Sequence, residues 1–122
     1  MDKALTIRTR RDSGYVIVTV AGEIDIATVA RLRERLSVLA AGGLPLVADL
    51  DQVSFMDATG LGALAVAARR AAGHGVSLHV VCDQPQTRRL FRVTGLDRQV
   101  PLARNLAEAL RALGVGRDTQ PS

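Results

Sequence analysis

The pattern that most constrains the fold is an alternation of short apolar runs with amphipathic segments, most of which end at glycine. Two runs at the N-terminus, residues 4–10 and 15–20, flank the turn sequence Asp12-Ser13-Gly14 and predict a β-hairpin. Further strands are predicted at residues 45–50, 76–82 and 100–102, and helices at residues 26–41, 58–72, 85–94 and 106–113. This β-β-α-β-α-β-α-β-α order predicts an α/β domain with a mixed, mostly parallel sheet of about five strands and about four helices.

The spacing of apolar residues predicts which faces are buried. In the first helix Val29, Leu32, Leu36 and Leu39 recur at intervals of three and four, as expected for one helical face. The second helix has a stripe of small apolar residues that lets it lie close to a sheet, and the third is expected to bury Leu90, Phe91 and Val93. The members of the second stripe are Leu61, Leu64, Ala65 and Ala68. Residues 45–50 are apolar without alternation, which is typical of a strand covered on both faces. We therefore expect Val18, Val47 and Leu64 in the core.

The length and composition of the chain limit the number of domains and the cellular location that can be expected. The chain of 122 residues is long enough for one domain, which we place at residues 1–113, with a Gly- and Pro-containing tail at residues 114–122 that is expected to be disordered. No apolar run reaches the roughly 18 residues needed to span a bilayer. The start lacks the basic, apolar and small-residue pattern of a secretory signal. These features predict a cytoplasmic protein without a membrane partner.

Charge and residue types argue against several functions. The net charge of +4 comes from an excess of arginine that is spread along the chain, and the three aromatic residues, Tyr15, Phe55 and Phe91, offer no base-stacking surface. Nucleic acid is therefore not an expected partner. The single cysteine, Cys82, excludes an internal disulfide, and together with His74 and His79 it forms no metal-ligand pattern, so neither a metal nor a cofactor is expected.

Enzyme motifs are missing from the sequence. It contains no Gly-x-Gly-x-x-Gly, no Gly-x4-Gly-Lys-Ser/Thr and no Gly-x-Ser-x-Gly, and neither histidine has a nucleophile at motif spacing. A phosphoryl-accepting receiver domain would need an acidic cluster after its first strand, where this chain has Arg10-Arg11 and Gly22. The sequence thus favours a binding module without catalytic residues.

The most informative segment is the entry into the second helix, Asp57-Ala58-Thr59-Gly60-Leu61-Gly62. Asp57 is a good N-cap. Two glycines in the first turns of a helix cost about 1 kcal/mol each relative to alanine, so something must offset them. Either the helix start packs closely on the sheet, or another molecule approaches the backbone there; the spacing alone leaves both open.

A second loop is expected beside this one. Asp25 follows Gly22-Glu23-Ile24 at the end of the second strand. Loops after parallel strands gather at one edge of a sheet, so Asp25 and Asp57 are expected to lie near each other if the second strand runs parallel to the later ones. Asp25 is also placed to cap its own helix, with Thr28 three residues on, and the two roles are compatible.

At this point the sequence resembles bacterial anti-sigma factor antagonists, which are single STAS domains. The matching segments lie in order along residues 5–113, and together they are specific. They are Gly22-Glu23-Ile24-Asp25, Val47-Ala48-Asp49-Leu50, residues 53–62, Arg88-Arg89-Leu90-Phe91 and Thr94-Gly95-Leu96-Asp97. The resemblance implies the STAS fold and a partner switch. In such a switch the antagonist binds an anti-sigma factor of the small kinase type, and the sigma factor is released.

The resemblance also implies a binding surface and a control step. The residues placed at the partner surface are Asp25, Asp57, Ala58, Thr59, Gly60, Leu61 and Gly62. In the family, the kinase phosphorylates a Ser or Thr at the start of the second helix, which ends binding, and a phosphatase reverses it. The usual acceptor directly follows the Asp, where this chain has Ala58, so Thr59 is the remaining candidate. A STAS scaffold or a small-ligand sensor in a signalling or transport complex is the alternative function, and a homodimer is left open.

Overall fold

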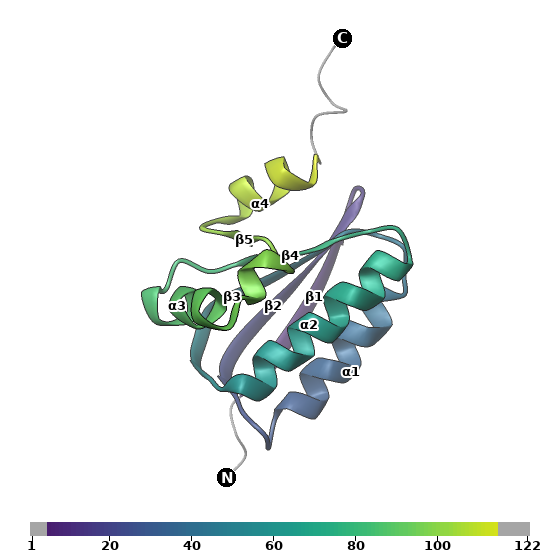
Figure 1. Ribbon diagram of the computed structural model, residues 1–122. Coiled ribbons are helices and arrows are strands. Elements are labelled where there is room, and N and C mark those ends of the chain that lie inside the picture. Colours follow the sequence, from purple (N-terminus) through teal and green to yellow (C-terminus); the bar gives the residue numbers. More distant parts are fainter. Residues whose placement is uncertain (1–4, 115–122) are drawn as a thin grey trace.

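The computed structural model describes residues 5–114 (Figure 1), so the tail predicted at residues 114–122 lies almost entirely outside the described residues. The elements follow the predicted order. The strands are β1 (Thr6–Asp12), β2 (Tyr15–Ile24), β3 (Leu46–Met56), β4 (Leu78–Val81) and β5 (Leu102–Ala103). The helices are α1 (Val29–Ala40), α2 (Ala58–Gly73), α3 (Pro85–Thr94) and α4 (Leu106–Leu113), with a short 3-10 helix, η1, at Leu96–Arg98. The predicted order of strands and helices is confirmed.

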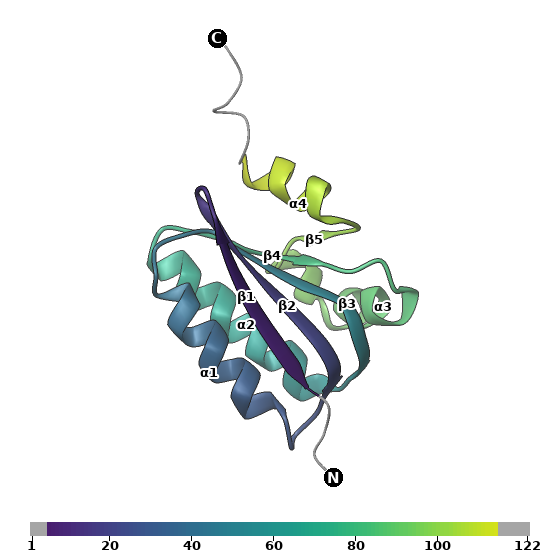
Figure 2. The same ribbon diagram turned by 180° about the vertical axis from the view of Figure 1, so that it is seen from behind.

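The five strands form one sheet in the order β1-β2-β3-β4-β5. β1 pairs with β2 antiparallel through the predicted hairpin, where Gly14 takes a positive φ of 86°, and the other strands are parallel. Helices α1, α2 and α3 cover one face of the sheet, whereas α4 packs on the other (Figure 1 and Figure 2). The carboxyl ends of the parallel strands therefore share one edge, next to the start of α2.

The core lies mainly between the sheet and these three helices. Val18, Val47 and Leu64 are fully buried, as predicted, and so are the alternating residues Leu46, Ala48 and Leu50 of β3. Leu46, Ala48 and Leu50 belong to this main core, while Val47 points into a smaller cluster under α4. β3 is thus covered on both faces, as its unbroken apolar run predicts.

The two central strands are longer than the sequence indicates. Residues 21–24 and 51–56 were expected outside the strands, but they extend β2 and β3 and pair with each other. The register shifts twice in this stretch, between Thr19 and Ala21 and between Gly22 and Glu23. Such irregularities break the two-residue alternation from which a strand is recognised. They carry both strands to the edge where the two loops begin.

Other boundaries differ for local reasons. α1 begins at Val29 rather than at residue 26, because the Asp25 carboxylate accepts the N–H groups of Ala27 and Thr28 in a turn. β4 is shorter than predicted and β5 lies one to two residues later. The predicted burial of Val93 is wrong: this side chain is 72% exposed. Phe91 faces the core, and a residue two positions further along a helix is turned by about 200°.

His79 gives the domain a predictable response to pH. It lies in β4, it is buried, and its Nδ1 has no hydrogen-bond partner among the described residues. Burial disfavours the charged ring and lowers the pKa of His79 from 6.5. The unfolded chain then binds the proton more readily, so the free energy of unfolding is expected to fall as the pH drops from about 7.5 to about 5.5.

Urea unfolding at both pH values measures this effect. His79→Leu should reduce the difference in unfolding free energy between the two pH values, because it removes the buried imidazole. An unchanged pH response in His79→Leu would show that other groups cause it.

Candidate functional site

The parallel pairing of β2 and β3 brings two loops together at one edge of the sheet. Ile24 is paired with Met56 at the ends of the two strands, and the Asp57 N–H donates to the Ile24 carbonyl at 3.2 Å. Asp25 and Asp57 therefore start neighbouring loops, one entering α1 and the other α2 (Figure 1). The expectation that these two residues lie near each other is confirmed.

Asp25 organises the first loop. Its Oδ1 accepts hydrogen bonds from the N–H groups of Ala27 at 2.9 Å and Thr28 at 3.1 Å. In return, the buried Thr28 Oγ1 accepts the Asp25 N–H at 3.0 Å and donates to the Glu23 carbonyl at 2.8 Å. This reciprocal pair satisfies N–H groups ahead of α1, as a capping interaction does. Thr28 is the N-cap of α1 and has no side-chain cap hydrogen bond, so Asp25 does not cap the helix itself but closes the turn before it, and Ile26 in this turn is 81% exposed.

Asp57 and Thr59 organise the second loop. Asp57 is the N-cap of α2, with extended backbone, and its Oδ1 accepts the Thr59 N–H at 2.9 Å. The Thr59 hydroxyl donates to the same carboxylate oxygen. The half-buried Thr59 side chain is therefore turned toward the cap, whereas Ala58 is exposed. The Thr59 hydroxyl therefore has a local role at the helix start, with the Asp57 carboxylate as its acceptor.

The two glycines of α2 have different environments. A Cβ atom on Gly60 would lie 2.7 Å from Met56 Cγ and 2.9 Å from Ile24 Cγ2. Gly60 therefore lets α2 approach the ends of β2 and β3, which is the packing explanation. A Cβ on Gly62 would meet nothing within 4 Å, and Gly62 is exposed. No packing within the described domain accounts for Gly62, so its helix-propensity cost is left without compensation in the isolated chain.

The exposed side of α2 is small and apolar. Ala58, Gly62 and Val66 recur every four residues, so they lie on one side of the helix; we call this surface the α2 face. Val66 is 47% exposed, while Leu61 is buried and belongs to the core. Two further apolar side chains are exposed at the same edge of the sheet, Ile26 and the 53% exposed Phe55. Together these side chains form a surface suited to contact with another protein.

Ile26 and Phe55 were not singled out in the sequence as surface residues. Each lies next to an irregularity: Ile26 is inside the Asp25 turn, and Phe55 follows the register shifts near the end of β3. In such a segment the regular spacing of a helix or strand does not indicate which way a side chain faces. Residue type is then the remaining signal, and for an apolar residue it favours the core. The signal that could have identified them is the position of both residues beside the motifs at Asp25 and Asp57.

Cys82 is the single cysteine of the chain. Cys82 is buried, and this burial raises the pKa of its thiol, which disfavours the nucleophilic thiolate. Within residues 5–114, no three His, Cys, Asp or Glu side chains gather where they could bind a metal ion. Over the same range, no helix combines the length and apolar character needed to cross a membrane.

Comparison with known proteins gives a consistent family assignment. Residues 6–109 match the model of the STAS domain. The chain is 33% identical to the anti-sigma-F factor antagonist RsfB of Mycobacterium tuberculosis over 115 residues, which cover 93% of each protein. It is 35% identical to the anti-sigma-B factor antagonist of Bacillus subtilis over 92 residues, or 75% of this chain and 84% of that protein.

A solved structure agrees over nearly the whole chain. The crystal structure of an anti-sigma factor antagonist from Mycobacterium paratuberculosis superimposes with a TM-score of 0.84 at 34% identity. The match covers 91% of this chain and 95% of that one. The residues that match the STAS domain model, 6–109, include both loops and α2.

Proposed function

Because the chain belongs to the STAS domain family, with anti-sigma factor antagonists among its relatives, we propose that it binds an anti-sigma factor and thereby frees a sigma factor for transcription. It acts as a binding module in the cytoplasm, without a catalytic step of its own. The observation that carries this proposal is Gly62. This residue is exposed, and no internal contact of the described residues requires a glycine there. Because it has no side chain, another molecule can approach the backbone of α2 closely. Contacts with a partner that packs against this face offset the helix-propensity cost of Gly62, which no contact within the described residues offsets.

The contact surface combines the α2 face with the loop at Asp25. The exposed Ala58 and Gly62 allow close approach of a partner backbone, and Ile26 supplies an apolar side chain beside them. Asp25 and Asp57 hold the two loops in place, Asp25 through the turn before α1 and Asp57 as the N-cap of α2. Gly60 and Leu61 support the surface from beneath, through their packing on the strands and the core. The partner is an anti-sigma factor of the small kinase type.

An anti-sigma factor of this type would release its sigma factor if the sigma factor and this chain competed for one surface, or for one conformation, of the anti-sigma factor. Adding negative charge beside Ala58 would end the complex, since a phosphate carries about −1.5 to −2 charges at neutral pH and would be buried against the partner. Alanine at this position removes the hydroxyl that the kinase would modify. We therefore infer that this antagonist is not controlled by phosphorylation at the usual position.

Thr59 is a poor substitute for that acceptor. Its hydroxyl donates to the Asp57 carboxylate, so a phosphate there would lose this bond and lie beside a negative charge. The side chain is also turned by about 100° around the helix from that of Ala58. Phosphoryl transfer depends on positioning of the attacking oxygen, so a kinase organised for the first position would not reach the second efficiently. The domain is then constitutively competent to bind, and a phosphatase has no substrate here.

Kinase assays with a serine variant test this inference. With the cognate kinase and ATP, we expect no phosphate on the wild-type chain, whereas the Ala58→Ser variant should gain one on the introduced serine, read by intact-mass and peptide mass spectrometry. Thr59→Ala, made in both backgrounds, is the matched control, because it removes the other hydroxyl and should leave both results unchanged. Stoichiometric phosphate on Thr59 of the wild type, together with loss of partner binding, would contradict the inference.

The function itself is tested by release of sigma factor. Kinase-type anti-sigma factors of the source organism are purified, each in complex with its sigma factor. Each complex is mixed with the chain, and the mixture is separated by size-exclusion chromatography. Appearance of free sigma factor and a new complex with the chain would support the proposal. If the chain instead elutes alone with every pair and assembles with a larger STAS complex, the scaffold function is the correct one.

A further inference from the structure

A groove runs between the end of β3 and α3, beside the start of α2. It has a volume of about 450 Å3, and its walls include Phe55 and Met56 on one side and Leu90 and Val93 on the other. Phe55 is 53% exposed and Val93 is 72% exposed, so two large apolar side chains stand at its rim. Exposed apolar side chains that line a groove mark protein-interaction sites or ligand-binding grooves.

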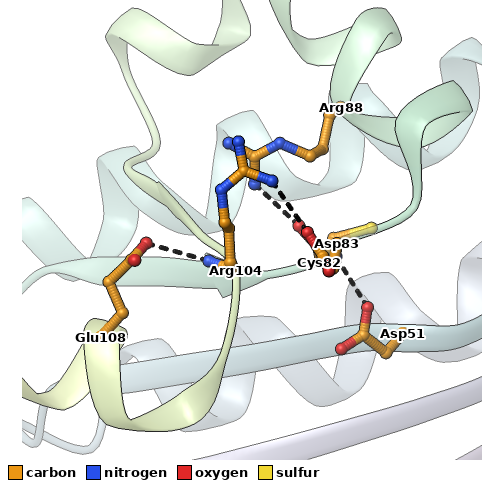
Figure 3. A network of polar contacts seen from close by, with 6 residues as sticks. All are labelled: Asp51, Cys82, Asp83, Arg88, Arg104 and Glu108. Atoms are coloured by element: carbon orange, nitrogen blue, oxygen red, sulfur yellow. Dashed lines mark hydrogen bonds and ion pairs between the residues drawn. The ribbon is translucent and has the colours of Figure 1, made fainter.

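The far wall of the groove is held in place by a polar network. Arg88 Nη1 donates to the Cys82 carbonyl at 2.8 Å, and the Asp83 N–H donates to the Asp51 carboxylate at 2.8 Å (Figure 3). Arg104 Nη1 contacts the Asp83 carboxylate at 2.9 Å. These contacts join the turn before α3 to β3 and to the segment before α4. The groove is present in the domain without a ligand, and a preformed groove lowers the free energy that binding spends on ordering it.

The same wall is positively charged. α3 carries Arg88, Arg89 and Arg92 and contains no acidic residue. Arg88 is tied to the backbone as described, whereas Arg89 and Arg92 are exposed, and Arg89 borders the groove. A ligand seated here meets apolar side chains within the groove and guanidinium groups at its edge. This combination favours a segment that presents an apolar side chain flanked by carboxylates.

The groove is continuous with the surface that we assign to the partner. Met56 in its wall directly precedes Asp57, the N-cap of α2, and Phe55 lies between the groove and the loop at Asp25 along the sheet edge. A protein that covers the start of α2 therefore lies next to the wall of the groove at Phe55 and Met56.

We propose that this groove is a second contact for the anti-sigma factor, and that it receives an apolar side chain from an acidic segment of that protein. This inference rests on the proposed function and adds the chemistry of the partner. The α2 face lets the partner approach closely, while the groove anchors a side chain and Arg89 pairs with the acidic residues around it. The two contacts together define one continuous binding surface.

Affinity measurements with single variants test the groove. Val93→Asp places a carboxylate at its apolar rim, and Arg89→Glu reverses the charge at its edge. We expect about 30-fold weaker binding to the purified anti-sigma factor for Val93→Asp, and about 10-fold for Arg89→Glu with a smaller loss of affinity between about 50 and about 300 mM salt. Val38→Asp is the matched control: Val38 is 67% exposed on α1, away from both surfaces, and should bind as the wild type.

The outcomes separate this inference from the proposed function. Circular-dichroism melts first confirm that all variants are folded. If the wild type binds and either groove variant binds as tightly as Val38→Asp, the groove proposal is overturned and the function stands. If the wild type binds none of the kinase-type anti-sigma factors, the function fails instead. Weaker binding of both groove variants, with normal binding of the control, supports the groove as the second contact.

Discussion

Replacing Gly62 by arginine is expected to weaken binding of the anti-sigma factor by at least about 100-fold, a loss of about 2.7 kcal/mol. Gly62 is exposed in the middle of the α2 face, and a Cβ there meets nothing within 4 Å of the domain itself. The long side chain would therefore stand up from the surface and hold the partner away from Ala58. Isothermal titration calorimetry with the purified partner measures the change in affinity.

The same variant is expected to fold normally. Arginine has a higher helix propensity than glycine by about 0.8 kcal/mol, so the melting temperature should stay the same or rise. Gly62→Ala separates size from helix stabilisation, because it adds one methyl group and should bind within a few fold of the wild type. Val38→Arg controls for the added positive charge at a site outside the surface. Wild-type affinity in Gly62→Arg, with an intact melt, would show that the partner does not cover this face.

Much of the fold could be predicted because its signals are local. The hairpin at Gly14, the stripe of Val29, Leu32 and Leu36, and the stop at Gly95 each follow from a few neighbouring residues. The extension of β2 and β3 could not be predicted in this way. Residues 21–24 and 51–56 pair with each other across two register shifts, so their strand conformation depends on a contact between distant segments.

The candidate site was predictable in position but not in the role of each residue. Parallel strands place Asp25 and Asp57 at one edge, which element order predicts on the condition that β2 runs parallel to β3, as it does. The contrast between Gly60 and Gly62 could not be predicted, because two glycines in the same helix differ only in the side chains that surround them in the folded domain. The groove could not be predicted either, because its walls come from β3 and α3, which are distant in sequence. Val93 lies two residues after the buried Phe91, and its angle around α3 turns it outward.

Leu64→Ala is expected to lower the free energy of unfolding by about 2–5 kcal/mol. Leu64 is fully buried on the inner side of α2 and belongs to the main core between the helices and the sheet. Removing its branched end loses apolar burial and leaves a cavity that the surrounding strands can fill only in part. Equilibrium unfolding in urea, followed by circular dichroism, gives the change directly.

Val66→Ala in the same helix is the matched control. Val66 is 47% exposed and two residues further along α2, so its truncation should cost less than about 1 kcal/mol, in part because alanine is the better helix former. The comparison also separates the two sides of α2. Leu64→Ala should retain wild-type affinity at temperatures where it remains folded, because its side chain does not reach the α2 face. A loss below about 1 kcal/mol for Leu64→Ala would mean that α2 is not seated on the sheet as described. The placement of the α2 face, which depends on that seating, would then be wrong as well.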